Sequence, residues 1–425
     1  MLAAAYVLAL LPARSLAAEP ASGTTSLDHV HIYLMTMGSG GAVYERFGHN
    51  ALVVRDGREP IAFNYGYFSF EEHNFILRFL QGRMDYWMAA ADADREVESY
   101  IRAGRAVWEQ ELNLSPTQKA RLLATLTSQV DERYRYDYYT ANCSTKVRDA
   151  LDDAVGGQIR KQLADRPAGI TYRYDTRRLM AYNPPLYIAL QFILGHEVDR
   201  PLSEWQACYL PVRLKDYLAN VSITDESGHT HPLIQQTRLL NRGSEPEPAR
   251  PPHWWWIDLL IGLGIGTSLA LLARLSLRHW TFRAIFAAFS ALWLFIVAFA
   301  GCFAVGAWLV TTHVASYYNE NILQFSPIVV PLMVLVPMLA LRKRRPGRWT
   351  LAFAIALLGS SILGLALKAL PWFYQANWPL IALVLPAHAG LLLAVLQLRS
   401  MPQQLQHVEH HDRQADPAPE KPHNR

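Results

Sequence analysis

The chain has 425 residues, of which 51% are hydrophobic and 18% charged, so it is long enough for two domains of ordinary size. These averages blend two different segments: residues 22–250 have a globular composition, whereas long apolar runs dominate residues 254–398. Much of the net charge of +4 at pH 7 comes from basic loops between the apolar runs. A basic excess in that position reflects membrane topology, so it is a poor argument for nucleic-acid binding.

The N-terminal segment predicts a secreted protein. Residues 1–17 combine an apolar run, Leu2–Leu11, that is short for a membrane span with a Ser15–Ala17 segment that suits signal-peptidase cleavage. No Lys or Arg precedes the apolar run, which departs from the usual signal peptide. A short uncleaved anchor is the alternative, and it places the following domain on the same side of the membrane.

Residues 24–242 are typical of a secreted α+β domain, and a Pro- and Glu-rich linker at 243–252 follows them. Alternating or β-branched segments predict strands, and apolar residues at helical spacing predict helices. Ser115 and Pro116 supply an N-cap and a first helical position. The predicted strands are His29–Thr36, Phe47–Arg55 and Ile61–Tyr67, and the first predicted helices are Arg95–Arg102 and Thr117–Tyr134.

A further helix is predicted to begin at Asn142-Cys143 and to end at Gly156-Gly157. Its apolar face is formed at helical spacing by Cys143, Val147, Ala150, Leu151 and Ala154. Cys143 therefore lies in a first helical turn, where free N–H groups and a positive potential favour the thiolate. The same N–H groups can stabilise a developing oxyanion.

A cysteine nucleophile needs a base and a third group that orients the base. His49, in the second predicted strand, is the best candidate base. In the third strand either Asn64 or Tyr65 can orient the imidazole, since strand alternation lets only one face it, and we favour Asn64 because an amide is the commoner partner. The competing interpretation is a structural disulfide between Cys143 and Cys208, because both lie on the oxidising side of the membrane.

The other chemistry-bearing residues predict no metal or cofactor site. His29 and His31 share a face of the first predicted strand, but no third ligand lies at a suitable spacing. The Gly38–Gly41 run lacks the Lys and Ser/Thr of a phosphate-binding loop. Four aromatic residues form either an acyl-binding or membrane-facing edge or ordinary core: Phe75, Phe79, Tyr86 and Trp87.

The second half of the chain, residues 253–399, predicts five membrane-spanning helices ahead of a disordered tail at 400–425. Prolines in the third span predict a kink. The loops at 274–283 and 342–348 are basic, whereas those at 311–324 and 371–377 contain no Lys or Arg. The positive-inside rule then puts the first domain outside a bacterial inner membrane and the C-terminus in the cytoplasm. The predicted spans are Trp254–Ala273, Ala284–Val310, Phe325–Leu341, Thr350–Leu370 and Trp378–Leu398.

Three segments of the first domain together resemble the Lnb family, which is named for a bacterial lipoprotein N-acyltransferase. They are Phe47–Leu52, Phe63–Phe70 and Asn142–Asp149, and Leu210–Leu214 matches a further family element downstream. In the membrane half, His313–Pro327 is similar to a family signature, although residues 320–324 are less aromatic than expected. The order of His, polar strand residue and Cys also resembles a circularly permuted papain-like (NlpC/P60-type) fold.

This resemblance implies an acyltransferase with Cys143 as nucleophile, His49 as base and Asn64 as the orienting group. A fatty acyl group would pass from a phospholipid or a lipoprotein's diacylglyceryl group, through a Cys143 thioester, to the N-terminal cysteine of a lipoprotein. Simple hydration explains the polar residues of the loop outside the membrane equally well. The implied substrate-binding residues are Tyr65, His313, Asn319 and Asn321.

Two other functions remain open from the residues alone. A papain-like peptidase or amidase acting on peptidoglycan would use the same thiol, although five spans exceed what anchoring such an enzyme requires. A non-catalytic membrane scaffold would instead contain the oxidised Cys143–Cys208 pair.

Overall fold

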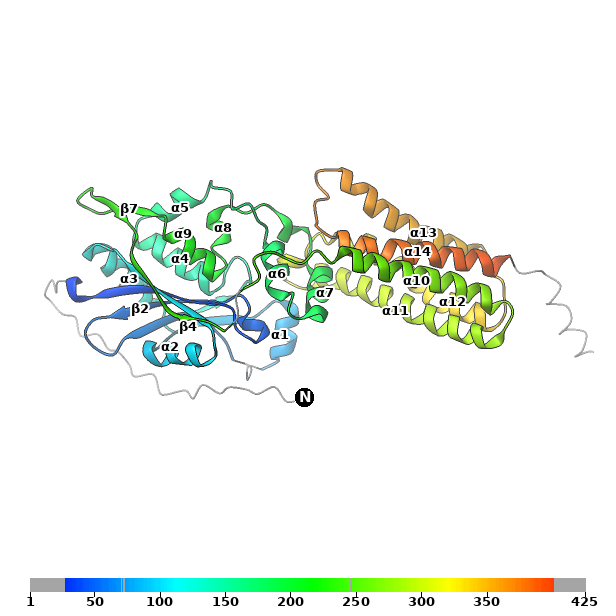
Figure 1. Cartoon of the computed structure of the whole chain (residues 1–425), viewed down its shortest axis with the longest axis horizontal. Helices are drawn as coiled ribbons and strands as arrows, with labels where there is room; N and C mark the ends of the chain where they lie inside the picture. The colour runs from blue at the N-terminus through cyan, green and yellow to red at the C-terminus, as the bar shows by residue number, and fades with distance from the viewer. Residues whose placement is uncertain (1–26, 70, 72, 245–246, 401–425) are drawn as a thin grey trace, which may run out of the picture.

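The computed structural model describes residues 27–69, 71, 73–244 and 247–400. The predicted signal peptide and the tail from residue 401 onward lie outside the described residues. The described chain forms an N-terminal part of mixed α/β structure, and a bundle of long helices extends away from it (Figure 1).

A seven-stranded antiparallel sheet forms the centre of the N-terminal part, with the order β6-β4-β3-β2-β1-β5-β9. Its strands are β1 (His31–Met37), β2 (His49–Arg55), β3 (Ile61–Tyr67), β4 (Asp85–Asp92), β5 (Ala106–Leu112), β6 (Arg133–Arg135) and β9 (Ile234–Arg242). The short strands β7 (Ser222–Thr224) and β8 (Thr230–Pro232) pair separately. The prediction of mixed helix and strand structure is confirmed, and the papain-like permutation stays a prediction.

Helices cover both faces of the sheet, as its alternating residues require. On one face Leu52 of β2 packs in a large core with Val147 and Leu151. On the other face Ala51 and Val53 pack toward the second helix of the chain. The helices of this part are α1 (Phe75–Gln81), α2 (Ala93–Arg102), α3 (Pro116–Gln129), α4 (Cys143–Ala154), α5 (Gln158–Leu163), α6 (Tyr172–Met180), α7 (Pro184–Ile193), α8 (Glu204–Ala207) and α9 (Pro211–Leu218).

Two elements have different boundaries in the structure from those predicted. Residues 27–29 form a 3₁₀ turn, so the predicted strand face shared by His29 and His31 is wrong; His31 Nδ1 instead lies 2.7 Å from Glu111 Oε1. The helix predicted over Thr117–Tyr134 ends at Gln129, and Arg133–Arg135 pairs with β4. Pairing at the sheet edge here outweighs the local helical preference.

The C-terminal part consists of α10 (Trp255–Ser276), α11 (Trp280–Val310), α12 (Val330–Leu341), α13 (Arg348–Ala366) and α14 (Trp378–Arg399). Among the described residues, four helices are long and apolar enough to cross a bilayer, or five if the segments 314–323 and 327–341, bent by 50°, form one span. The bend lies at the start of the predicted third span, and the kink expected within that span stays a prediction. The chain is therefore a multi-pass membrane protein.

Glycines let α10 and α14 approach each other closely. A Cβ built on Gly262 would lie 2.2 Å from the carbonyl oxygen of Leu383, and one on Gly266 would lie 2.3 Å from that of Pro386. Spacing of small residues by four positions is a common basis of helix packing in membranes, because there van der Waals contact replaces the hydrophobic effect.

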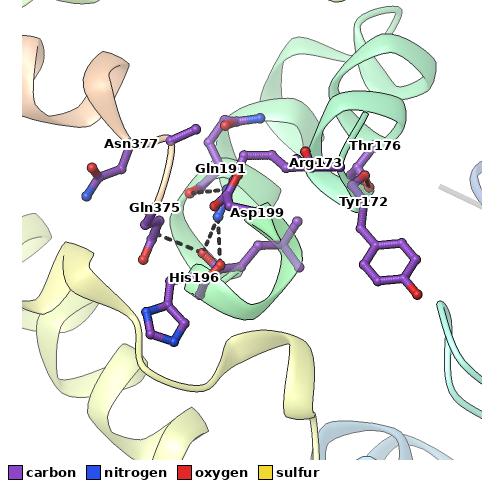
Figure 2. A network of polar contacts seen from close by, with 12 residues as sticks. Tyr172, Arg173, Thr176, Gln191, His196, Asp199, Gln375 and Asn377 are labelled. Carbon is purple, nitrogen blue, oxygen red and sulfur yellow. Dashed lines mark hydrogen bonds and ion pairs between the residues drawn. The ribbon is translucent and has the colours of Figure 1, made fainter. Parts of the chain in front are cut away.

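A buried polar network, drawn in Figure 2, holds the two parts of the chain together. Arg173 on α6 forms an ion pair with Asp199 (Nε–Oδ2 2.8 Å) and donates to the carbonyls of Leu194 and Gly195, both at 2.9 Å. Gln375, between α13 and α14, donates to the same Leu194 carbonyl at 3.0 Å. One set of backbone acceptors thus serves both parts.

The loop between α11 and α12 adds to this junction. The side-chain amides of Asn319 and Asn321 each donate to the Phe192 carbonyl at 2.9 Å, and Asn377 donates to Asn321 Oδ1 at 2.8 Å. The two loops that lack Lys and Arg therefore contact the N-terminal part. The basic loops lie at the opposite end of the bundle (Figure 1).

Gly195 provides a test of the junction. Its N–H donates to the Ala315 carbonyl at 2.8 Å, and an added Cβ would lie 1.9 Å from the Tyr317 carbonyl oxygen. We expect Gly195→Ala to destabilise the detergent-solubilised protein by about 1–3 kcal/mol, measured by thermal unfolding, because backbone must move to admit the methyl group. Gly41→Ala is the control, since nothing lies within 4 Å of its added Cβ. Equal melting temperatures for the two variants would contradict a tightly packed junction.

Candidate functional site

Cys143 lies in the first turn of α4, as predicted, and its helix end is firmly capped. The Asn142 Oδ1 accepts the Thr145 N–H at 2.9 Å, and Thr145 Oγ1 accepts the Asn142 N–H at 2.8 Å. The Asn142 amide also donates to the Tyr209 carbonyl at 2.9 Å, which ties the cap to the end of α8. This reciprocal capping leaves the thiol beside the free N–H groups of a helix N-terminus.

The structure brings His49 and Asn64 together with the thiol. His49 Nε2 lies 2.9 Å from Asn64 Oδ1, and the imidazole is also hydrogen-bonded to Cys143. The Asn64 amide nitrogen donates to Glu96 Oε2 at 2.9 Å, so the amide oxygen must face the imidazole. His49 therefore carries its proton on Nε2, and Nδ1 is left to accept the thiol proton.

Glu96 on α2 is a member of this relay that the sequence did not reveal. Its second carboxylate oxygen, Oε1, accepts a hydrogen bond from the Tyr67 hydroxyl at 3.0 Å. In the sequence Glu96 is one of several acidic residues on an amphipathic helix, and no pattern distinguishes it from Asp94 or Glu98. Its role follows only from the packing of α2 against the sheet.

The surroundings favour a thiolate–imidazolium pair. Burial raises the pKa of the Cys143 thiol, but His49 and the backbone N–H groups of Asn50 and Ser144 stabilise the thiolate, and the net pKa is lowered. Burial lowers the pKa of His49, but Cys143, the hydrogen bond with Asn64 and the charge of Glu96 outweigh it, and the net pKa is raised. Burial raises the pKa of Glu96, against the hydrogen bond from Asn64 and the charge of His49.

His49 and Cys143 approach each other from opposite sides of the sheet. His49 shares a strand face with Ala51 and Val53 on the α2 side, whereas Cys143 belongs to the core on the α4 side. Gly66, at a bulge in β3 with φ +101°, gives the thiol its room: an added Cβ would lie 3.7 Å from Cys143 Cβ. A side chain at that position would meet Cys143 at ordinary van der Waals distance, but its backbone conformation would be strained.

Tyrosine side chains lie close to the buried thiol. The Cβ position built on Gly66 lies 3.9 Å from Tyr136 Cε2 and 4.0 Å from the Tyr134 hydroxyl. The Tyr134 hydroxyl is buried and has no hydrogen-bond partner among the described residues. The alternation of Tyr134, Tyr136 and Tyr138 is the sequence signal that could have identified these tyrosines.

Two ring contacts connect the thiol site with the membrane part. Tyr136 contacts Tyr138 with ring centroids 5.8 Å apart, and Tyr138 stacks on His313 at 6.3 Å. His313 follows the end of α11, and its Nε2 lies 2.8 Å from the Phe79 carbonyl oxygen. Of the predicted substrate-binding residues in this loop, His313 is thus the one linked to Cys143 by contacting rings.

The other predicted substrate-binding residues have different surroundings. Tyr65 is 3% exposed in the α4-side core, and its hydroxyl donates to Gln129 on α3. Asn319 and Asn321 bind the α7 carbonyls described above. Cys208 is buried and free, as is Cys143, so the disulfide alternative is wrong for this structure. Among the described residues, no group of three or more His, Cys, Asp or Glu is placed to hold a metal ion.

One comparison with known proteins gave a match to part of the chain. Residues 17–182 match the family model of the Lnb N-terminal periplasmic domain. The N-terminal part of the chain therefore contains an Lnb N-terminal periplasmic domain. The match includes β1 to α6 and every residue of the relay, whereas α7 and all later elements of the chain lie beyond it. Neither the curated proteins nor the solved structures contained a match to the chain.

The charge of Glu96 can be tested through the reactivity of Cys143. In Glu96→Gln the amide oxygen still accepts from Asn64, but the charge that raises the pKa of His49 is gone, so the thiolate loses part of its stabilisation. As pH falls, the thiolate is protonated and alkylation of Cys143 stops. We expect the pH at which the alkylation rate falls, the acid limb of the pH–rate profile, to move upward by about one pH unit in Glu96→Gln.

The measurement is the rate of iodoacetamide labelling of the Cys143 peptide, followed by mass spectrometry across a pH series. Glu98→Gln, an exposed carboxylate on the same helix, is the matched control and should keep the wild-type profile. An unchanged limb in Glu96→Gln would exclude an electrostatic role for this carboxylate.

Proposed function

We propose that this protein is a membrane-anchored cysteine acyltransferase that transfers a fatty acyl group to the N-terminal cysteine of bacterial lipoproteins. The observation that carries the proposal is the position of a polarised thiol in an Lnb domain, two ring contacts away from the end of a membrane-spanning helix. A thiol so placed favours substrates that reside in the membrane over soluble or cell-wall substrates.

In the first step the Cys143 thiolate attacks the ester carbonyl of a phospholipid or of a lipoprotein's diacylglyceryl group. A C–S bond forms, the ester C–O bond breaks, and the His49 imidazolium protonates the departing alkoxide. The products are a Cys143 thioester and a free hydroxyl on the donor.

In the second step the amine of the lipoprotein's N-terminal cysteine attacks the thioester. His49 accepts the proton that the amine loses, the C–S bond breaks, and the thiolate is regenerated while an amide forms. An ester is thus exchanged for an amide without any change of oxidation state, and the sequence of steps needs no cofactor.

Three donors are available for the oxyanion of both steps. The backbone N–H groups of Asn50 and Ser144 already point toward the sulfur of Cys143. The buried Tyr134 hydroxyl, without a partner among the described residues, lies at the same site. Donors fixed in a site with little water stabilise a developing negative charge without reorganisation.

We further propose an inner-membrane location, with the Lnb domain in the periplasm and the C-terminus in the cytoplasm. The basic loops at the far end of the bundle support this orientation. Of the loop residues considered as substrate-binding, we propose that role for His313. For Asn319 and Asn321, which are buried and bound to α7 carbonyls, we propose a role in holding the two parts together.

The acyl-transfer activity is tested directly with Cys143→Ala. We expect lipoproteins in membranes that contain the wild-type protein to gain an acyl chain on the N-terminal amine, and those with Cys143→Ala to lack it. Mass spectrometry of lipoprotein N-terminal peptides is the measurement, and Cys302→Ala on α11 is the control for loss of a thiol. Unmodified N-termini in both wild type and variant would contradict the proposal and favour a peptidase or amidase.

The oxyanion role of Tyr134 is tested by removing only its hydroxyl. We expect Tyr134→Phe to slow acyl transfer by roughly a hundredfold, because one preorganised donor is lost. The labelling rate of Cys143 by iodoacetamide should stay unchanged, since alkylation forms no oxyanion. A parallel loss of both rates would instead indicate a disturbed thiol, and no loss of either would exclude the role.

A further inference from the structure

Helix α1 exposes an apolar surface that the fold of the N-terminal part does not cover. None of its seven residues is buried. Ile76 is 73% exposed, and Leu77, Leu80 and Phe79 are 53%, 52% and 42% exposed. Four large apolar side chains together on a seven-residue helix form a patch that is uncommon on a water-facing surface.

The helix is fixed beside the membrane part. The Thr312 N–H, just after α11, donates to the Gln81 carbonyl at 2.9 Å, and the Thr312 hydroxyl lies 2.9 Å from the carbonyl oxygens of Gln81 and Gly82. The last residues of α11, Leu309 and Val310, are themselves 75% and 72% exposed, as expected of a surface that faces lipid. Figure 1 shows α1 at the end of the N-terminal part that adjoins the bundle.

We propose that α1 lies in the outer leaflet of the bilayer beside α11 and opens the Cys143 site to membrane lipids. Its apolar patch continues the lipid-facing surface of α11, so the lipid that surrounds the spans is the occupant that the position favours. The charged residues beside α1 are compatible with a position at the membrane surface. Arg83 and Arg135 are exposed close to the helix, and the Arg135 guanidinium donates to the Gly82 carbonyl at 3.3 Å. Arginines beside an apolar surface favour anionic lipid headgroups.

A row of contacting aromatic rings runs from α1 to the thiol. Phe79 contacts Phe75, Phe75 contacts Phe68, and Phe68 contacts Tyr86, with centroids 6.4, 6.2 and 5.1 Å apart. Tyr86 then stacks on Tyr136 at 4.1 Å, next to Cys143. This row gives an acyl chain apolar contact along the whole path from the leaflet to the nucleophile. The lipid-access role of α1 rests on the proposed function, whereas its contact with the bilayer does not.

The bilayer contact is tested by the depth of a probe on α1. Ile76→Cys is labelled with the fluorophore NBD in full-length protein carrying Cys143→Ala and Cys302→Ala, reconstituted in vesicles of phosphatidylethanolamine and phosphatidylglycerol. Leu239→Cys on β9, 47% exposed, is the matched control. We expect lipids with a doxyl group in the acyl chain to quench residue 76 strongly and residue 239 weakly, and aqueous iodide to do the reverse.

Two results would overturn the contact. Quenching of residue 76 by iodide to the same extent as residue 239 would place α1 in water. Shielding of residue 76 from both quenchers would mean that a second copy of the chain or another protein covers it. Because this background lacks the nucleophile, its outcome is independent of whether acyl transfer occurs.

Lipid access is tested by Ile76→Asp combined with Leu80→Asp. We expect acyl transfer from membrane lipid to fall roughly tenfold or more, because the donor is no longer held near the thiol. Iodoacetamide labelling of Cys143 should keep its rate, and Leu239→Asp with Leu240→Asp is the charge-matched control. Acyl transfer at the wild-type rate would overturn lipid access through α1. If the wild-type protein itself transfers no acyl group, the proposed function fails, and the quenching result still decides the membrane contact.

Discussion

The buried ion pair between Arg173 and Asp199 is the constraint on which the placement of the site depends. Both side chains are almost fully buried, and burial of two charges is costly unless their hydrogen bonds are satisfied. The planar guanidinium meets this condition by binding the carboxylate and backbone carbonyls at once. Those carbonyls lie directly after α7, where Gln375 of the membrane part also binds. The pair thereby organises the surface on which the two parts meet.

A rigid junction would serve the proposed acyl transfer, because it keeps the thiol at a fixed distance from the membrane helices. The side-chain amides of Asn319, Asn321 and Asn377 form hydrogen bonds at the same junction. Polar residues of the membrane part thus hold the two parts together. Gly195 lets the backbones come into direct contact there. With α6 and α7 held against the bundle, α1 lies at the end of the N-terminal part that adjoins the long helices (Figure 1).

At the site itself, four elements contribute one chemical group each. α4 presents the thiol, β2 the imidazole, β3 the amide and α2 the carboxylate, and the last three groups lie on the α2 side of the sheet. Each hydrogen bond fixes the next, because the carboxylate orients the amide and the amide sets the tautomer of the imidazole. Burial alone would favour neutral groups; the linked charges reverse that preference and favour the thiolate.

Several local features of this protein are predictable from its residues alone: the helix that begins at Cys143, the strands with His49 and Asn64, and the apolar runs of the membrane part. These features follow from periodicity and capping among neighbouring residues, which act over a few positions of the chain. The packing of distant elements, by contrast, completes the relay with Glu96, brings the buried Tyr134 hydroxyl near the thiol, and encloses Tyr65, Asn319 and Asn321. Asn64 and Glu96 are 32 residues apart, and their contact depends on the pairing of β3 and the packing of α2. No local pattern encodes such a contact, because its energy exists only once the separate elements have come together.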